Sequence, residues 1–190
     1  ALYSYPVIPF TVAIVANQPN TFNQTLYIHR ITRDSYTPIV YPNETMVMDP
    51  RIPDFVMRIP AGTSIKDWQG NQVDKVKVMQ VPIDRLGVNK LPEGVSPTVV
   101  YMFSFDRWGG AIPSRPIPVV FPNDIDALPG DKVDLWYYDE SPNPGESPND
   151  WGKFGTGTVS PDGLRIVSDP GVGIPKFCCG ASFATNPAAT

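Results

Sequence analysis

The chain has 190 residues, which suits one domain with a substantial hydrophobic core. Its net charge is −4, no basic cluster is longer than a pair, and no apolar run approaches the roughly 18 residues that cross a bilayer, so nucleic acid and membrane insertion are not expected. The 23 prolines, 15 glycines and 42% hydrophobic residues predict many short strands joined by rigid turns, with almost no helix.

Residues 1–50 contain short apolar runs separated by polar turns, including one predicted at 17–20. We expect two or three strands here, either as part of the main body or as a small β subdomain. The first six residues open directly into strand-like sequence without a leader, which suggests a processed or internal piece of a larger polypeptide. The Pro-rich and charged segment 49–54 is the predicted internal boundary.

Three more strands are predicted between residues 55 and 105, with Gly or Pro turns between them. The third of these, residues 98–105, alternates most clearly. Val99, Tyr101, Phe103 and Phe105 recur at every second position, which indicates a strand in the core.

Residues 115–173 read as consecutive antiparallel strands with dedicated turns at 128–131 and 160–163, where Pro and Gly suit tight backbone. Within 132–139, Val133 and its alternate residues face one way, and Trp136 and Tyr138 the other. The Ala, Thr, Asn and Pro content of 181–190 predicts a linker that frays. Together these patterns predict an antiparallel β-sandwich of eight to eleven short strands over residues 51–180, extended by the N-terminal strands.

Three aromatic residues are the candidate contacts for a ligand or partner: Trp136, Tyr138 and Trp151. If their face of the sheet is exposed, they form a patch suited to stacking on sugar rings or to docking a neighbour. If both faces are covered, they belong to the core. The sequence leaves both alternatives open.

Carboxylates are frequent between residues 124 and 150, and Asp124, Asp126 and Asp131 are the candidate calcium ligands. No Asp-x-Asp-x-Asp-Gly loop is present, so a solvated acidic rim is the alternative, and no other cofactor is expected. Two acids from this group facing one another across a cleft would give a glycosidase-like hydrolase, a third and weaker hypothesis.

The only histidine, His29, is a weak basis for a catalytic triad or for a zinc site with Cys178 and Cys179, and we interpret it as a half-buried strand residue. Cys178 and Cys179 are adjacent, and a bond between neighbours closes a strained ring. They are free thiols, a vicinal disulfide, or bridges to another subunit.

An ordered series of short motifs carries a resemblance to a known family. The motifs are Ile59–Thr63, Val81–Leu86, Leu91–Gly94, Pro116–Val119, Phe121–Asn123, Leu128–Gly130, Trp151, Gly155–Ser160, Asp162–Gly163 and Asp169–Lys176. Over residues 53–180 this series resembles the ZU5-like β-sandwich module of very large secreted bacterial proteins that carry RHS repeats or strings of immunoglobulin-like domains. The resemblance implies a structural stalk or spacer without catalytic residues.

Two departures from that family are visible in the sequence. Members tend to continue with Gly-Trp where this chain has Phe177-Cys178-Cys179-Gly180, which suggests a different contact at this end. Some members cleave themselves at a His-Phe-Ser site, and the corresponding Met102-Phe103-Ser104 lacks the histidine that would act as base.

The sequence therefore favours a non-enzymatic structural or spacer module, extracellular or at the cell surface, whose partners are neighbouring domains or subunits. A filament subunit is one version of this hypothesis, in which residues 2–15 are donated as an added strand to the open sheet edge of a neighbouring subunit. The alternative is a carbohydrate-binding β-sandwich, assisted by calcium at the acidic loop.

Overall fold

The computed structural model describes residues 3–5, 14–21, 25, 27–32, 35–86, 91–106, 110–139, 150–177 and 182–185. Within these ranges the regular structure is β-strand apart from short 3₁₀ turns such as η2 (Ile83–Arg85). All strand pairs among the described residues are antiparallel. The predicted all-β, antiparallel fold class is thereby confirmed.

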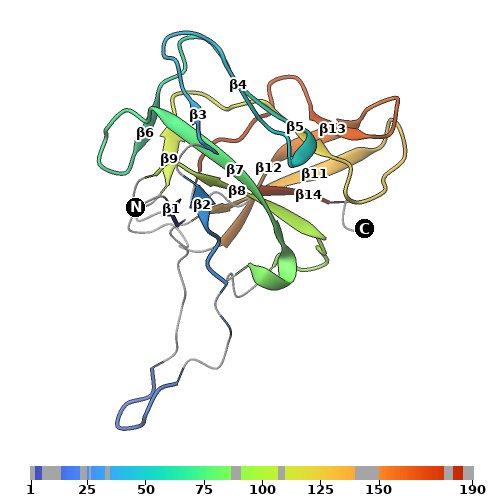
Figure 1. The fold of residues 1–190 in the computed structure, drawn as a ribbon. Coiled ribbons are helices and arrows are strands. Elements are labelled where there is room, and N and C mark those ends of the chain that lie inside the picture. The colour runs from blue at the N-terminus through green and yellow to red at the C-terminus, as the bar shows by residue number, and fades with distance from the viewer. Residues whose placement is uncertain are drawn as a thin grey trace.

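Ten described strands form one sheet, and two small two-stranded sheets flank it (Figure 1). In spatial order the large sheet contains β3 (Thr37–Pro38), β7 (Lys75–Pro82), β8 (Val99–Ser104), β14 (Ser182–Thr185), β11 (Lys132–Asp139), β12 (Asp150–Val159), β13 (Arg165–Ser168), β10 (Val119–Pro122), β5 (Ile52–Ile59) and β4 (Thr45–Asp49). The small sheets pair β1 (Tyr3–Ser4) with β2 (Ile31–Thr32), and β6 (Ile65–Asp67) with β9 (Ala111–Pro113).

The long sheet folds over on itself, and its two halves enclose the main core. Phe55 of β5 stacks on Tyr101 of β8 with ring centroids 5.4 Å apart, although five strands separate β5 from β8 in the sheet order. Phe121 of β10 lies 4.9 Å from Tyr101 and 6.0 Å from Phe55. Because inward-facing side chains from both halves meet in this way, the architecture is a β-sandwich.

Strand β8 is covered on both faces, as the alternation in residues 98–105 predicted for a core strand. Tyr101, Phe103 and Phe105 belong to the main core between the two halves of the sheet. Val100, on the opposite face, belongs to a second and smaller core that also contains buried Val95, Tyr138, Trp151 and Phe183.

The predicted boundary at residues 49–54 is a hairpin turn inside the sheet. β4 pairs with β5 on either side of Pro50 and Arg51, and the Asp49 carboxylate accepts the backbone N–H of Arg51 at 2.9 Å. Of the two alternatives for the N-terminal strands, membership of the main body therefore holds for β3 and β4. β1 and β2 pair with each other in a separate small sheet.

The expectation that residues 181–190 are a fraying linker is wrong for 182–185. These residues form β14, which lies between β8 and β11, with Ala184 paired to Leu135 and Ser182 paired to Tyr101. The Ala- and Thr-rich composition suggested a linker, but the fully buried Phe183 anchors the strand in the second core. A single large apolar residue outweighs the composition around it because its burial stabilises the paired strand.

Both predicted turns of the 115–173 region are confirmed. At 128–131, Gly130 adopts a φ of 87° and the Asp131 N–H donates to the Leu128 carbonyl at 2.9 Å. At 160–163, Gly163 adopts a φ of 74° and its N–H donates to the Ser160 carbonyl at 2.9 Å. Glycine suits both positions because positive φ costs it little.

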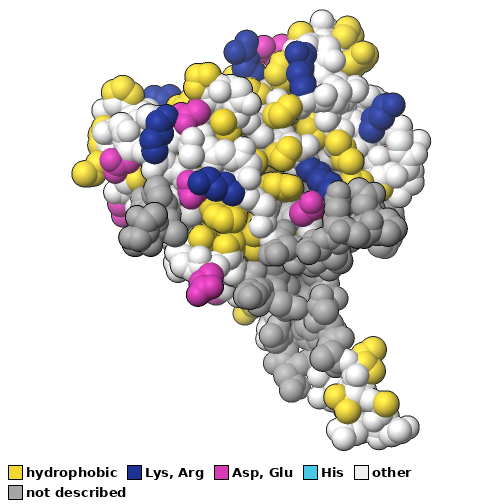
Figure 2. All heavy atoms as spheres, turned by 180° about the vertical axis from the view of Figure 1, so that it is seen from behind, with side chains coloured by type: hydrophobic (Ala, Val, Ile, Leu, Met, Phe, Trp, Pro, Cys, Tyr) yellow, Lys and Arg dark blue, Asp and Glu magenta, His cyan; other side chains and the backbone are white. Residues whose placement is uncertain are grey.

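Residues 14–21 lie at the end of a projection from the body (Figures 1 and 2). Asn20 closes the turn here, accepting the Val15 N–H at 2.8 Å and donating to the Val15 carbonyl at 3.0 Å. Ile14 and Val15 are exposed, and Figure 2 shows hydrophobic side chains at this tip. On the body in the same view, basic and acidic side chains are interspersed with apolar ones. Among the described residues, no helix is long and apolar enough to cross a bilayer.

Candidate functional site

The three candidate aromatic residues lie in the second core. Tyr138 is 6% and Trp151 7% exposed, and their rings meet edge to face at 5.1 Å. Trp151 also contacts Phe183 at 4.7 Å, and the half-buried Trp136 stacks on Phe183 at 6.4 Å. The predicted alternation along β11 is correct, but the exposed aromatic patch does not form. Phe183 of the neighbouring β14 extends this face, and Ile83, Leu86, Leu91 and Val95 from the connection between β7 and β8 pack with it in the second core.

The three candidate calcium ligands do not come together. Asp124 bonds to Tyr101, the Asp131 carboxylate accepts the Leu128 N–H at 2.9 Å within its turn, and Asp126 is exposed with a φ of 53°. In the ranges that the structure describes, no group of three or more His, Cys, Asp or Glu side chains could hold a metal ion. These acids therefore have separate local roles.

Two other predictions fall on residues outside the described ranges. They are the state of Cys178 and Cys179, and the strand expected to be lent from residues 2–15, of which only 3–5, 14 and 15 are described. Both stay predictions.

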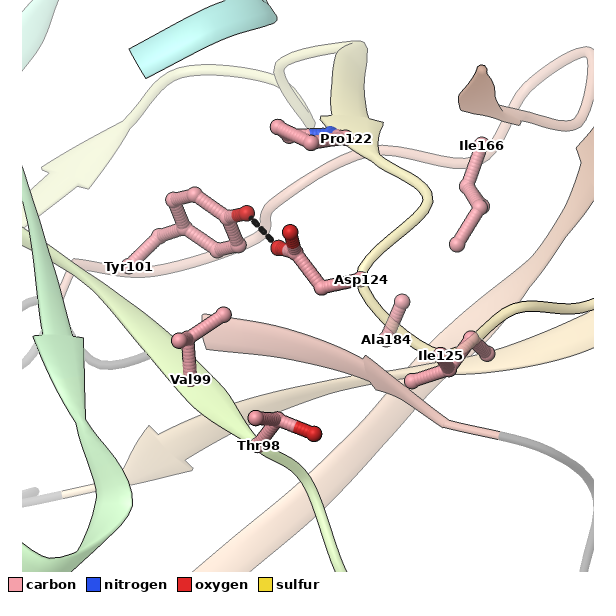
Figure 3. Close-up of a pocket in the computed structure, with 8 residues that line it drawn as sticks. All are labelled: Thr98, Val99, Tyr101, Pro122, Asp124, Ile125, Ile166 and Ala184. Atoms are coloured by element: carbon pink, nitrogen blue, oxygen red, sulfur yellow. Dashed lines mark hydrogen bonds between the residues drawn. The ribbon is translucent and has the colours of Figure 1, made fainter. Parts of the chain in front are cut away.

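Asp124 and Tyr101 form a polar pair at the edge of the main core (Figure 3). Tyr101 projects from β8 and donates its hydroxyl hydrogen bond to the Asp124 carboxylate, which follows β10 in the chain. Apolar side chains surround the pair, among them Val99, Ile125 and Ile166. The cavity beside it measures about 10 Å³, which is room for one water molecule at most.

Burial raises the pKa values of both groups in this pair. For the Asp124 carboxyl, the hydrogen bond from Tyr101 opposes the rise in pKa that burial causes. Burial and the neighbouring carboxylate also raise the pKa of the Tyr101 hydroxyl far above its usual value. The phenol therefore stays a hydrogen-bond donor at neutral pH, which gives the pair a structural role.

Replacing Tyr101 with Phe is expected to raise the Asp124 pKa further, because the variant keeps the ring but loses the donor. The folded-state pKa of Asp124 already lies above its unfolded value. The carboxyl group therefore contributes fully to the free energy of unfolding below about pH 4, and this contribution is lost as the pH rises through the folded-state pKa. The variant should therefore lose about 1–3 kcal/mol at neutral pH and less in acid. Carboxyl ¹³C titration and urea unfolding measure both effects, with Tyr41→Phe as an exposed control. An unchanged Asp124 pKa would contradict the assigned contact.

A buried ion pair joins the two ends of the folded sheet. Asp49, the last residue of β4, lies against the Lys77 ammonium of β7, and the two side chains are 2% and 8% exposed. Arg51 completes the group, donating from Nε to Asp49 Oδ1 at 3.1 Å and from Nη2 to Oδ2 at 2.9 Å. These contacts connect β7 and β4, which lie near opposite ends of the strand order.

Beside this ion pair lies a cleft of about 280 Å³. Its lining comes from the segment before β2, from the β4–β5 hairpin and from β7: His29, Arg30, Asp49, Arg51, Ile52, Val78, Met79 and Gln80. His29 is half-buried, as expected, but precedes β2 instead of lying in a strand. Its Nε2 atom is buried with no hydrogen-bond partner in the described structure, and burial, followed by the charge of Arg85, lowers its pKa. His29 is therefore neutral at pH 7, and the cations that line the cleft are Arg30 and Arg51.

The cleft is the candidate binding site that sequence reasoning missed. Its residues come from three separate segments, so no spacing in the sequence connects them. One signal was available: Lys77 lies in the strongly apolar run from Val76 to Val81, where a buried lysine requires an acidic partner. The sequence does not say which of the 19 acidic residues supplies it.

Comparison of the chain with protein-family models, with curated proteins and with solved structures gives no match. The resemblance to ZU5-like modules therefore stays a hypothesis that rests on the motif series alone.

Proposed function

We propose that this chain is a non-enzymatic structural module, a spacer in a larger secreted or surface-exposed assembly. The observation that supports this most is the position of β14, the last described strand, between β8 and β11 in the sheet. A strand paired on both sides holds residues 182–185 in the body through backbone bonds to two neighbours. A module that transmits tension between its neighbours needs such an attachment.

The direction of β14 also suits a load-bearing role. In Figure 1, β14 runs toward the side of the body away from β1. A pull between β1 and the far end of β14 therefore has a component along β14 and strains its bonds to β8 and β11 together. A pull across the strand would instead break those bonds one after another.

Several polar residues of the described structure also link strands. The Asp169 carboxylate, after β13, accepts hydrogen bonds from Thr156 and Thr158 of β12, each at 2.6 Å, and pairs with Lys132 of β11 at 2.7 Å. These bonds lower the pKa of Asp169 to about 2, so it stays ionised down to acidic pH. The carbohydrate-binding alternative would need a surface other than Trp136, Tyr138 and Trp151, because these residues pack in the second core.

Single-molecule force spectroscopy tests the proposal. In the first geometry, the chain is placed between two marker domains and pulled from its ends. In the second, the same chain is pulled between residues 98 and 185, and the unfolding forces of the two geometries are compared. Register extrapolated from the Ser182–Tyr101 pair places these two residues opposite each other on β8 and β14, so that this pull peels β14 away. We expect a clearly higher unfolding force end to end. An equal or lower force would contradict the spacer role.

A further inference from the structure

The cleft beside the buried ion pair lies along a free strand edge. β3 pairs with β7 only through Thr37 to Val76 and Pro38 to Lys75, whereas β7 continues to Pro82. Among the described residues, β7 from Lys77 onward has a strand partner only on its β8 side. An open edge of this kind offers backbone groups to another chain.

Alternation along β7 shows which backbone groups face the open side. The Ile39 N–H donates to the Asp74 carbonyl at 2.8 Å, so the backbone of Asp74 points toward the β3 side. Successive residues of a strand direct their N–H and C=O groups to alternate sides, which places those of Val78 and Gln80 on the same open side. Both residues line the cleft. The edge thus presents two donor–acceptor pairs about 7 Å apart, the repeat of an extended peptide.

The charge of the cleft favours an acidic occupant. Among the residues that line the cleft, Arg30 and Arg51 contribute two positive charges and Asp49 contributes one negative charge, which the buried Lys77 ammonium offsets from behind. The site is therefore positive in a chain whose net charge is −4. The Arg51 side chain is 69% exposed and Arg30 is exposed too, so both guanidinium groups can reach an incoming carboxylate.

We propose that an extended acidic segment of a neighbouring polypeptide docks on the open edge of β7 as an added strand. Backbone bonds to Val78 and Gln80 hold the segment, and a carboxylate side chain meets Arg51 and Arg30. A lone anion would use the arginines but not the pair of backbone sites. The inference rests on the proposed function, because it names how a neighbouring part of the assembly attaches to this module.

Two synthetic peptides that differ in one group test the proposal: acetyl-Thr-Val-Glu-Val-Thr-amide and its twin with Gln in place of Glu. In ¹⁵N NMR titrations of the full chain, the Glu peptide should shift the amide signals of Val78 and Gln80 and slow their hydrogen exchange. It should bind about five-fold more tightly than the Gln peptide at low salt, and this advantage should shrink as salt rises.

Matched variants identify the charge that matters. Arg51→Gln should remove most of the preference for Glu, whereas Arg58→Gln should leave it unchanged, because Arg58 is similarly exposed but pairs with Glu44 elsewhere. The unfolding free energy of each variant is measured alongside, so that lost binding is separated from lost folding.

Other outcomes would overturn the proposal. Equal affinity for the two peptides would exclude an acidic partner. Acetate serves as a small-anion probe. If it shifts the NMR signals of Arg30 and Arg51 as strongly as the peptide does, and leaves the amide signals of Val78 and Gln80 unchanged, the cleft is a site for small anions. No shift at millimolar peptide would exclude strand addition. None of these results bears on the force comparison, which concerns β14, so the two proposals fail separately.

Discussion

Replacing Asp49 with Ala is expected to lower the free energy of unfolding by about 3–5 kcal/mol. The reason is Lys77, whose side chain is 8% exposed and would be left as a buried cation without its counter-ion. We also expect β4 to separate from β7 in this variant, because the Asp49–Lys77 ion pair connects these two strands. Equilibrium unfolding in urea measures the change, and an unaltered m-value would show that the unfolding transition exposes the same surface.

A second variant distinguishes the contribution of the Asp49–Lys77 interaction from the cost of leaving one charge buried without a partner. In Asp49→Asn combined with Lys77→Met, no unpaired charge remains, so we expect a smaller loss than the two single changes predict in sum. Glu44→Ala is the control, since Glu44 pairs with Arg58 at the surface and should cost about 1 kcal/mol or less. A loss below about 1 kcal/mol for Asp49→Ala would show that the buried pair is not what joins the two strands.

The pH dependence of the same pair has a definite sign. Hydrogen bonds from Arg51 and Lys77 hold the pKa of Asp49 well below its usual range, although burial works in the opposite direction. A folded-state pKa below the unfolded value contributes stability that is present above about pH 4 and is lost as the pH falls through the folded-state value. The difference in stability between the natural chain and Asp49→Asn should therefore narrow in acid.

Replacing Phe183 with Ala should also cost about 3–5 kcal/mol. Phe183 is fully buried and is the contact through which β14 joins Trp151 and Trp136 in the second core. Its removal leaves a cavity between these rings and weakens β14, so hydrogen exchange at Leu135 and Ala184 should accelerate with the drop in stability.

The control for this prediction is Leu164→Ala, because Leu164 is 57% exposed and its loss should change stability by at most about 0.5 kcal/mol. If Phe183→Ala were as mild as the control and left exchange unchanged, residues 182–185 would behave as the linker that their composition suggests. The position of β14 in the sheet would then be wrong, and with it the support for a spacer.

The local features of this fold were predictable from short stretches of sequence. The alternation in 98–105 and 132–139, and the Pro-Gly and Pro-Asp-Gly turns, follow from backbone geometry that a few neighbouring residues determine. The alternation in 132–139 also assigned Trp136 and Tyr138 correctly to one face. It could not show that the face is covered, because the residues that pack against it, Ile83, Leu86, Leu91 and Val95, lie more than forty residues earlier in the chain.

The candidate site was not predictable, for the same reason of distance along the chain. Its lining and its open edge come from His29 and Arg30, from the hairpin at Asp49 to Ile52, and from β7. Each segment is an ordinary strand or turn in isolation. Only the folding of the sheet brings β4 against β7, leaves the edge of β7 that faces away from β8 without a described strand partner beyond Val76, and places two arginines beside that edge.

The sequence by itself determined that this protein is an antiparallel β structure with particular turns and a strongly apolar β8, because strand alternation and turn geometry are local. The tertiary structure decided which faces are buried, that the last described strand lies inside the sheet, and where charge gathers beside a free edge. These depend on contacts between residues far apart in the chain, which are selected by the packing of all strands together.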